Sequence, residues 1–161
     1  MPARKKSRST AAAAASESPK KPRMTTSPPE KTKSTARMSQ CVTYNNTVYL
    51  AGQVPDDCSA DIKGQTQDVL DKIDKLLEEV HCDKSKIISA TIYLKDITKD
   101  FGPMNEVWEA WVPSKYPPAR ATVQAEMARG DILVEIVIIA ALCKDYPEEE
   151  EEQEDGEEAE D

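Results

Sequence analysis

Residues 117–142 read PPARATVQAEMARGDILVEIVIIAAL, and this stretch decides the fold because it contains two strand-like runs joined by turn residues. In residues 121–127 apolar and polar side chains alternate, which is typical of a strand with one buried face. Residues 129–131 are Arg, Gly and Asp, so we expect the chain to reverse there and form an antiparallel hairpin. Residues 132–142 are apolar except for Glu135, which predicts a strand covered on both faces.

Two charged residues in this stretch are candidates for function. Arg120 follows two prolines, whose fixed φ angles stiffen the approach to the strand and suit a guanidinium that holds a carboxylate. Glu135 shares its strand face with apolar residues, so its carboxylate must find a hydrogen-bond donor or be neutralised, because an unpaired charge is costly to bury. From spacing alone, the alternative is a solvated strand-end cation and an edge-strand charge.

The expected hairpin also predicts how far apart these two charges lie. With the turn centred near residues 129 and 130, Arg120 lies opposite Ile139 and Glu135 opposite Gln124. This register separates the charges by on the order of 13 Å along the ladder. We therefore expect that they do not pair within one chain, and that a shared site would draw them from neighbouring subunits or bridge them through ligand and water.

Several segments in order resemble one known family. PPARATVQ (117–124) followed by LVEI (133–136) is similar to the signature of the Rid family, the YjgF/RidA reactive-intermediate imine deaminases, also called the L-PSP family. The resemblance extends over roughly residues 37–142. Upstream it includes three further segments: VYLAGQVP (48–55), SATIYLKDIT (89–98) and MNEVWEAWV (104–112).

The resemblance implies a fold, an assembly and a reaction. The family has a chorismate-mutase-like fold and forms homotrimers with sites between subunits. Its deaminases hydrolyse small 2-imino acids, or their enamine tautomers, to 2-keto acids and ammonia without a cofactor. Arg120 would then hold the carboxylate of the substrate, and Glu135 would orient or activate the attacking water. Gly52, Asn105 and Thr122 would line the substrate pocket.

Two departures make the chain look like a sister subgroup of the deaminases. Residues 37–40 read RMSQ where the deaminase branch has PYSQ, so Met38 replaces the site tyrosine. Val137 replaces the second acid of the family's EIE strand. These changes keep open a non-catalytic trimer that binds small carboxylates or a protein partner. The resemblance keeps open a third function, an RNA-directed translation inhibitor, because some members of the family are described as ribonucleases or translation inhibitors.

The rest of the chain predicts an α+β domain. We expect strands at 39–45 and 47–54 around an Asn45–Asn46 turn, and a third strand at 86–96 in which Ile88 shares the apolar face. Two helices are predicted on one face of a mixed sheet, which leaves the other face for a homo-oligomer. The first begins after Asp61 as N-cap, and the second has Pro103 in its first turn. Its apolar face is formed by Phe101, Met104, Trp108 and Trp111.

Charge divides the 161 residues into three parts. Residues 1–37 carry +8 and residues 145–161 carry −12, so the net −9 of the chain leaves −5 for the domain at 38–144. We expect both charged ends to be disordered, because they offer little to bury. An acidic domain argues against nucleic acid as a partner, because phosphate neutralisation needs clustered cations. A small carboxylate as substrate is what the family resemblance implies.

The remaining composition bears on metals and location. Four widely spaced cysteines and a single histidine predict no metal site. The chain has no secretory signal and no apolar run long enough for a membrane, so we expect a cytoplasmic protein with reduced thiols. Short basic runs near residues 4–8 and 19–23 keep nuclear import open as an alternative, and the scarcity of acids keeps a mitochondrial presequence open.

Overall fold

The computed structural model describes residues 28–143. In chain order its elements are β1 (Glu30–Ser34), β2 (Ser39–Tyr44), β3 (Thr47–Leu50), α1 (Ile62–Glu79), a 3-10 turn (Lys84–Lys86), β4 (Ile87–Leu94), α2 (Ile97–Trp111), β5 (Ala119–Gln124) and β6 (Val134–Ala141). Strand β1 lies within the segment 1–37, for which we expected no structure. The expectations for residues 1–27 and 145–161 concern parts of the chain outside the described residues.

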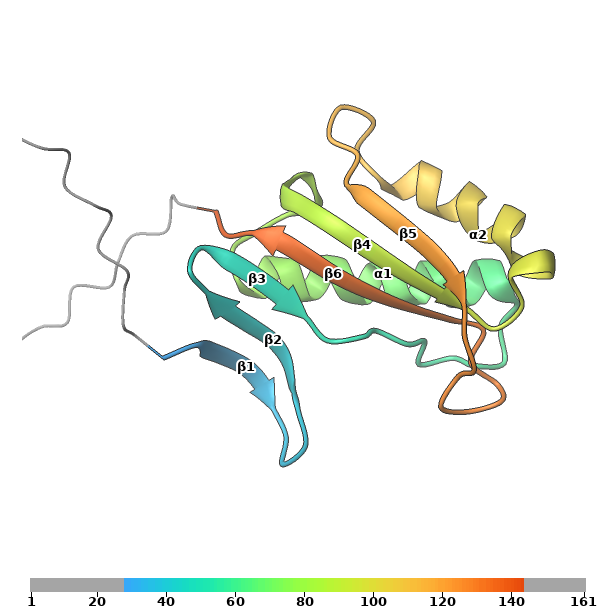
Figure 1. Ribbon diagram of the computed structural model, residues 1–161, viewed down its shortest axis with the longest axis horizontal. Helices are drawn as coiled ribbons and strands as arrows, with labels where there is room; N and C mark the ends of the chain where they lie inside the picture. Colours follow the sequence, from blue (N-terminus) through green and yellow to red (C-terminus); the bar gives the residue numbers. More distant parts are fainter. Residues whose placement is uncertain (1–27, 144–161) are drawn as a thin grey trace, which may run out of the picture.

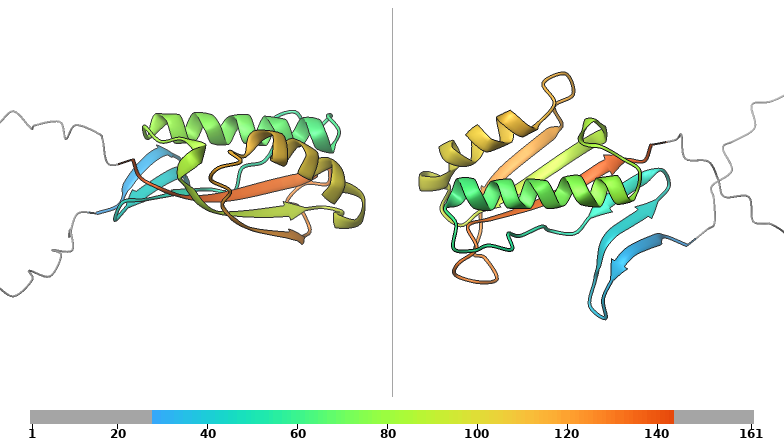
Figure 2. Two further views of the ribbon diagram at one scale, coloured as in Figure 1. Left: turned by 90° about the horizontal axis from the view of Figure 1, so that it is seen from above. Right: turned by 180° about the vertical axis from the view of Figure 1, so that it is seen from behind.

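Six strands form one mixed sheet in the order β1-β2-β3-β6-β4-β5. Only β4 and β5 pair in parallel, and all other neighbours are antiparallel. Both helices pack on the same face of the sheet (Figure 2). The predicted α+β architecture, with two helices on one face of a mixed sheet, is therefore confirmed.

The hairpin expected within residues 117–142 does not form. Strand β5 pairs in parallel with β4, and β4 lies between β5 and β6. The residues at 129–131 do turn the chain, but turn chemistry alone does not choose a strand's partner. Strand β6 is apolar along its length and lies between β3 and β4 (Figure 1), whereas the more polar β5 forms an edge.

Helix α1 follows its sequence signals. The Asp61 carboxylate caps it by accepting a hydrogen bond from the Gly64 amide at 2.9 Å, as predicted. One face packs on the sheet, and its buried apolar residues are Ile62, Val69, Leu70, Ile73, Leu76 and Leu77. The same helix buries Gln65, whose side-chain amide donates to the carbonyls of Cys58, Ala60 and Asp131. This amide joins the loop before α1 to the segment that leads into β6.

Strand β4 departs from simple alternation at its start. A bulge between Ile87 and Ser89 leaves Ile88 outside the regular register, and Ile88 is 52% exposed. Ile87 is buried in its place. The prediction that Ile88 shares the core face with Ala90 was therefore wrong, because one extra residue reverses the side to which a strand residue points.

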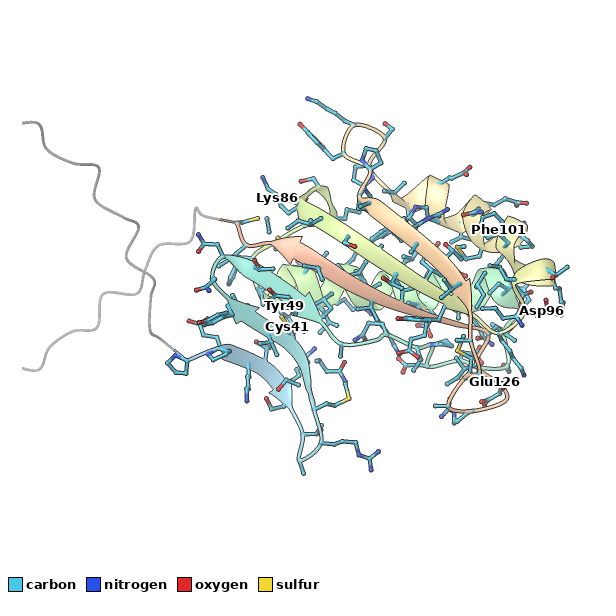
Figure 3. All side chains as sticks on the ribbon, viewed as in Figure 1. Cys41, Tyr49, Lys86, Asp96, Phe101 and Glu126 are labelled. Carbon is cyan, nitrogen blue, oxygen red and sulfur yellow. The ribbon has the colours of Figure 1, made fainter. Side chains whose placement is uncertain are left out.

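Helix α2 begins earlier than the sequence suggested. Asp96 is its N-cap and accepts a hydrogen bond from the Lys99 amide at 3.1 Å, which places Pro103 beyond the first turn. Phe101 is 43% exposed on the outer side of the helix (Figure 3), whereas its neighbour Asp100 is only 2% exposed. The predicted contact of Phe101 with the core was wrong, because the helix is rotated so that Asp100 faces inward.

The turn between β2 and β3 matches its prediction. Asn45 and Asn46 have φ angles of 49° and 59°, the left-handed region that asparagine tolerates better than most residues. The two strands pair from Cys41 opposite Leu50 to Tyr44 opposite Thr47. This hairpin leads the chain along β3 to Gly52.

Candidate active site

Arg120 lies on the edge strand β5, on the face that the helices cover. Its strand partner is Ala90, which is buried beneath the helices. The guanidinium donates a hydrogen bond from Nη1 to Oδ1 of Asn105 on α2 at 2.7 Å. Its centre also lies 5.4 Å from the ring of Trp108, a cation–π contact. Within the described residues no carboxylate forms an ion pair with Arg120.

Glu135 lies on β6, on the face that has no helix. Its apolar neighbours on this face of β6 are Val137 and Ile139, as the alternation predicted, and both are partly exposed. Leu133, which the alternation placed beside them, precedes the strand and lines a hollow with Ile62 and Pro103 of the helices instead. Among the residues that the structure describes, none forms a hydrogen bond or an ion pair with the Glu135 carboxylate. The site therefore contains an acid that one copy of the chain leaves unpartnered.

Gly52 is in direct contact with this carboxylate. A Cβ atom built at Gly52 would lie 1.9 Å from Oε1 of Glu135, far inside any allowed contact. Gln53 fixes the close approach of Gly52 to Glu135. Its backbone amide donates to the Ile136 carbonyl at 2.9 Å, and its backbone carbonyl accepts from the Ile136 amide at 3.0 Å. Glycine is required here because any side chain would displace the carboxylate.

Thr122 and Met38 lie apart from this contact. Thr122 follows Arg120 by two residues and shares its face of β5; its Oγ1 is buried and has no hydrogen-bond partner among the described residues. Met38 is 41% exposed in the turn between β1 and β2, where its carbonyl accepts from the Thr35 amide at 2.7 Å.

The predicted site residues thus form two groups that one chain does not bring together. Arg120, Asn105 and Thr122 belong to the edge formed by β5 and α2. Glu135 and Gly52 belong to the open face at β6. Arg120 pairs with Ala90 and Glu135 with Tyr93, so the predicted partners Ile139 and Gln124 were wrong. The expected separation of the two charges nevertheless holds, because β4 lies between their strands.

Neither group resembles a metal centre. In the described part of the chain, no three side chains of His, Cys, Asp or Glu gather as they would around a metal ion. No helix between residues 28 and 143 is long and apolar enough to cross a membrane. Together the two groups of residues offer a guanidinium, a carboxylate, a side-chain amide and a hydroxyl.

The chain is similar to known proteins over its whole described domain. Residues 29–142 match the family model described as Endoribonuclease L-PSP, which covers the whole sheet and both helices. The chain belongs to this family. The resemblance to the Rid (YjgF/L-PSP) signature is therefore confirmed, including the segments that carry Gly52, Asn105, Arg120 and Glu135.

Relatives and solved structures agree with this assignment. A RutC family protein from Haemophilus ducreyi is 45% identical over 108 residues, which are 67% of this chain and 92% of the relative. The RutC family protein YoaB from Escherichia coli is 45% identical over 107 residues, 66% of this chain and 92% of its own. A YjgF-family crystal structure from Neisseria meningitidis aligns with a TM-score of 0.68 at 40% identity, covering 71% of this chain and 94% of that one.

Sequence reasoning missed the two residues that position the site. Trp108 was assigned to the core, and it is 4% exposed, but its ring also supports the Arg120 guanidinium. Gln53 fixes the backbone beside Gly52, and its own side chain donates to Oε1 of Gln40 at 2.9 Å. The near-helical spacing of Asn105 and Trp108 was the available signal, since residues three apart lie on one helical face.

Proposed function

We propose that the protein hydrolyses small 2-imino acids, or their enamine tautomers, to 2-keto acids and ammonia, at sites completed between neighbouring copies of a homotrimer. The observation that carries the proposal is the pair of incomplete groups. Within residues 28–143, the edge at β5 presents the Arg120 guanidinium without a carboxylate partner, and the open face presents the Glu135 carboxylate without a donor. The guanidinium can bind the anionic end of a substrate, and the carboxylate can face its cationic end. Together the two groups therefore suit a substrate that carries both charges.

The open face of the sheet supports an oligomer. Two helices cover only one face, and among the described residues the other face carries apolar side chains that remain accessible. Tyr49 on β3 and Val123 on the edge strand β5 are 44% and 42% exposed (Tyr49 is labelled in Figure 3), and Val137 and Ile139 on β6 are partly exposed. A chain of this size can cover such an apolar face most simply by packing it against other copies of itself.

Arg120 is suited to hold the substrate carboxylate. Asn105 and Trp108 restrict its guanidinium from two sides, which lowers the entropy lost when an anion binds. A charge-assisted hydrogen bond to a carboxylate contributes about 1.5–3 kcal/mol, and a guanidinium can form two of them. The buried, unpartnered hydroxyl of Thr122 on the same strand face is available to a bound ligand.

Glu135 is suited to act as the general base that accepts a proton from the attacking water. The water oxygen forms a bond to the imine carbon while the C=N electron pair moves to nitrogen, and Glu135 accepts the proton released by the water. The carbinolamine formed from the protonated imine then collapses: Glu135 returns the proton to the nitrogen, the hydroxyl oxygen forms the carbonyl and passes its proton to Glu135, and the C–N bond breaks with its electron pair going to ammonia. The ammonia then takes up the Glu135 proton and leaves as ammonium. Atoms and charges balance without an added cofactor.

An RNA-directed role is the second candidate, and the description of the family as an endoribonuclease is the observation that favours it. The charge of the domain opposes it, since residues 38–144 carry a net −5 and phosphate binding requires clustered cations. A binder of small carboxylates without turnover would use the same Arg120 contacts and differ only at Glu135.

The deciding experiment measures ammonia release from a 2-imino acid generated in the assay by an amino-acid oxidase. Wild-type protein should accelerate ammonia release above the rate in buffer, and Glu135→Gln should return it close to that rate. Glu126→Gln, which removes an exposed acid shortly after β5 (Figure 3), is the matched control and should behave as wild type. Equal rates for wild type and Glu135→Gln, both above the rate in buffer, would exclude the catalytic role of Glu135. A wild-type rate no higher than the rate in buffer would leave the carboxylate binder.

A second measurement separates the RNA hypothesis. Incubation with a mixed-sequence single-stranded RNA should give no cleavage by the wild-type protein at moderate salt. Cleavage that falls steeply with added salt and persists in Glu135→Gln would instead support an RNA-directed activity, because salt competes with phosphate contacts.

A further inference from the structure

Two cysteines far apart in the sequence meet at one end of the sheet. Cys82 follows the end of α1, and Cys143 follows the end of β6. Their sulfur atoms lie 3.4 Å apart, with the Cys143 thiol donating to Cys82 Sγ. The Cys82 thiol in turn donates to the carbonyl of Ala141 at 3.1 Å. Both sulfurs are therefore held in contact by a short chain of hydrogen bonds.

The surroundings make the two thiols unequal. Cys82 is 7% exposed, whereas Cys143 is only partly buried. Burial, together with the hydrogen bond and the adjacent charge of Cys143, raises the pKa of the Cys82 thiol to about 11. Cys82 therefore keeps its proton at neutral pH, and Cys143 is the thiol that a dissolved reagent reaches first.

The other two cysteines have no such arrangement. Cys41 is 1% exposed in the core and contacts no other sulfur. Cys58 accepts a hydrogen bond from Nη2 of Arg129 at 2.8 Å, but it also has no second thiol beside it. Since all four cysteines lie within the described residues, the pair at 82 and 143 is the single dithiol of the chain.

We propose that Cys82 and Cys143 form an oxidisable dithiol, a modification site at which a small hydroperoxide such as hydrogen peroxide converts the two thiols into a disulfide. The sulfurs need to approach by about 1.4 Å to reach the bond length of about 2.05 Å. Cys143 lies beyond the last residue of β6, Ala141, so its side chain can move without breaking a strand pair. This site is separate from Arg120 and Glu135 and does not depend on the proposed deaminase activity.

The chemistry takes two steps. The Cys143 thiolate attacks one oxygen of the peroxide, a sulfur–oxygen bond forms, the oxygen–oxygen bond breaks, and the hydroxide released takes up a proton. The Cys82 sulfur then attacks the Cys143 sulfenic acid, a sulfur–sulfur bond forms, and the hydroxide that leaves takes the Cys82 proton. Two thiols and one peroxide yield one disulfide and two waters, so the sulfurs are oxidised and the peroxide is reduced.

The disulfide would alter how the sheet end is held. It closes a loop that contains β4, α2, β5 and β6, and it ties the end of β6 to the end of α1. A cross-link between segments this far apart in sequence restricts the unfolded chain, so the oxidised protein should unfold at a higher denaturant concentration. The cross-linked Cys143 precedes by two residues Asp145, where the acidic segment begins in the sequence.

The test uses the full-length reduced protein treated with a small molar excess of hydrogen peroxide, followed by catalase and alkylation under denaturing conditions. We expect two of the four thiols to be lost and the mass to fall by two hydrogen atoms. A peptide linking Cys82 to Cys143 should appear in a digest and vanish after treatment with dithiothreitol. Cys41 and Cys58 should remain alkylated.

Matched variants distinguish the loss of the disulfide from a failure of the variant to fold. Cys58→Ser is the control and should give the same yield of linked peptide. Cys143→Ser, which changes a partly exposed residue beyond the last strand, should give none and leave Cys82 alkylated. Cys82→Ala should lead to sulfinic acid at Cys143, because no second thiol intercepts the sulfenic acid. The proposal is overturned if wild-type Cys82 and Cys143 are recovered without a link, or linked only between different chains.

Discussion

Arg120 and Glu135 lie on opposite faces of the same sheet, with strand β4 between them. Arg120 pairs with Ala90, and Glu135 pairs with Tyr93, three residues further along β4. Three residues correspond to about 10 Å along the strand, and two strand spacings add about 10 Å across it. An odd number of residues also reverses the face, so neither rotamer changes nor small shifts can join these side chains within one copy.

Mixing two inactive variants should therefore restore activity. In a cyclic trimer each proposed site takes Arg120 from one copy and Glu135 from its neighbour. When Arg120→Ala and Glu135→Gln chains are unfolded together and refolded at equal amounts, about a quarter of the interfaces contain both wild-type residues. We expect ammonia release at about a quarter of the wild-type rate.

The same mixture without subunit exchange is the control. Native trimers combined without unfolding should retain only the low activities of the two parents. If co-refolded chains that have exchanged subunits, as shown by mass spectrometry of intact assemblies, give no more than the sum of the parents, the two residues do not share a site.

Gly52→Ala should impair the reaction without unfolding the protein. The new methyl group would lie 1.9 Å from Oε1 of Glu135, and the carboxylate must move away. A displacement of about 1 Å in a catalytic group lowers turnover by about 100-fold. We expect kcat to fall by about 10- to 100-fold in the ammonia assay, with a smaller change in KM, because Arg120 lies elsewhere.

Gly102→Ala is the matched control for this change. A Cβ atom at Gly102 meets nothing within 4 Å, and the residue lies in helix α2. This variant should keep wild-type kinetics and gain about 0.5–1 kcal/mol of stability, because alanine favours the helix. Wild-type kinetics in Gly52→Ala would show that the position of the Glu135 carboxylate does not matter.

Much of the fold could be predicted from local patterns, and the strand order could not. The Asn45–Asn46 turn and the Asp61 cap are set by neighbours in the sequence, and both were found where expected, whereas the alternation in β4 failed at the bulge beside Ile88. The partner of β5 is set by competition among distant strands. The apolar residues of β6 are buried best between β3 and β4, and the turn chemistry at 129–131 carries no information about that competition.

The residues proposed for the candidate site came from the family resemblance, and their arrangement could be predicted only in part. Family resemblance identified Arg120, Asn105 and Glu135, because these residues occur in matching segments. The support of Arg120 by Trp108 depends on how α2 packs against the edge strand. The same rotation of α2 exposes Phe101 and buries Asp100, and an exposed aromatic beside a buried acid cannot be inferred from hydrophobic periodicity.

Asn105 should affect binding more than turnover. Its Oδ1 accepts a hydrogen bond from Arg120 at 2.7 Å and fixes the direction of the guanidinium. Asn105→Ala removes a hydrogen bond of about 1 kcal/mol, so we expect KM, and the Kd of a keto acid measured by calorimetry, to rise about fivefold. Asn105→Asp should weaken binding further, because its carboxylate competes with the ligand for Arg120.

Glu109→Gln tests whether a charge elsewhere on α2 changes ligand binding at Arg120 without touching it. Glu109 is exposed on α2 and has no contact with Arg120 among the described residues, so its removal should leave Kd unchanged. Equal affinities for wild type, Asn105→Ala and Asn105→Asp would show that Asn105 does not position the guanidinium.

Asp100 should make the stability of the protein depend on pH. It is 2% exposed, its Oδ1 has no hydrogen-bond partner among the described residues, and burial raises its pKa. The folded state therefore binds this proton more tightly than the unfolded state does, and stability is lost as the pH rises from the ordinary pKa of aspartate through the raised value. Asp100→Asn removes the charge, so we expect it to unfold at higher urea than wild type near neutral pH.

The difference between Asp100→Asn and wild type should shrink as the pH falls, because the carboxyl is then protonated in both states. Asp57 provides a comparison of opposite sign, since its hydrogen bonds from Ser59 lower its pKa. Asp57→Asn should be less stable than wild type near neutral pH, and its deficit should vanish on acidification. Urea midpoints between pH 3 and 8 measure both trends, and a difference for Asp100→Asn that grows toward low pH would contradict a buried, unpartnered carboxylate.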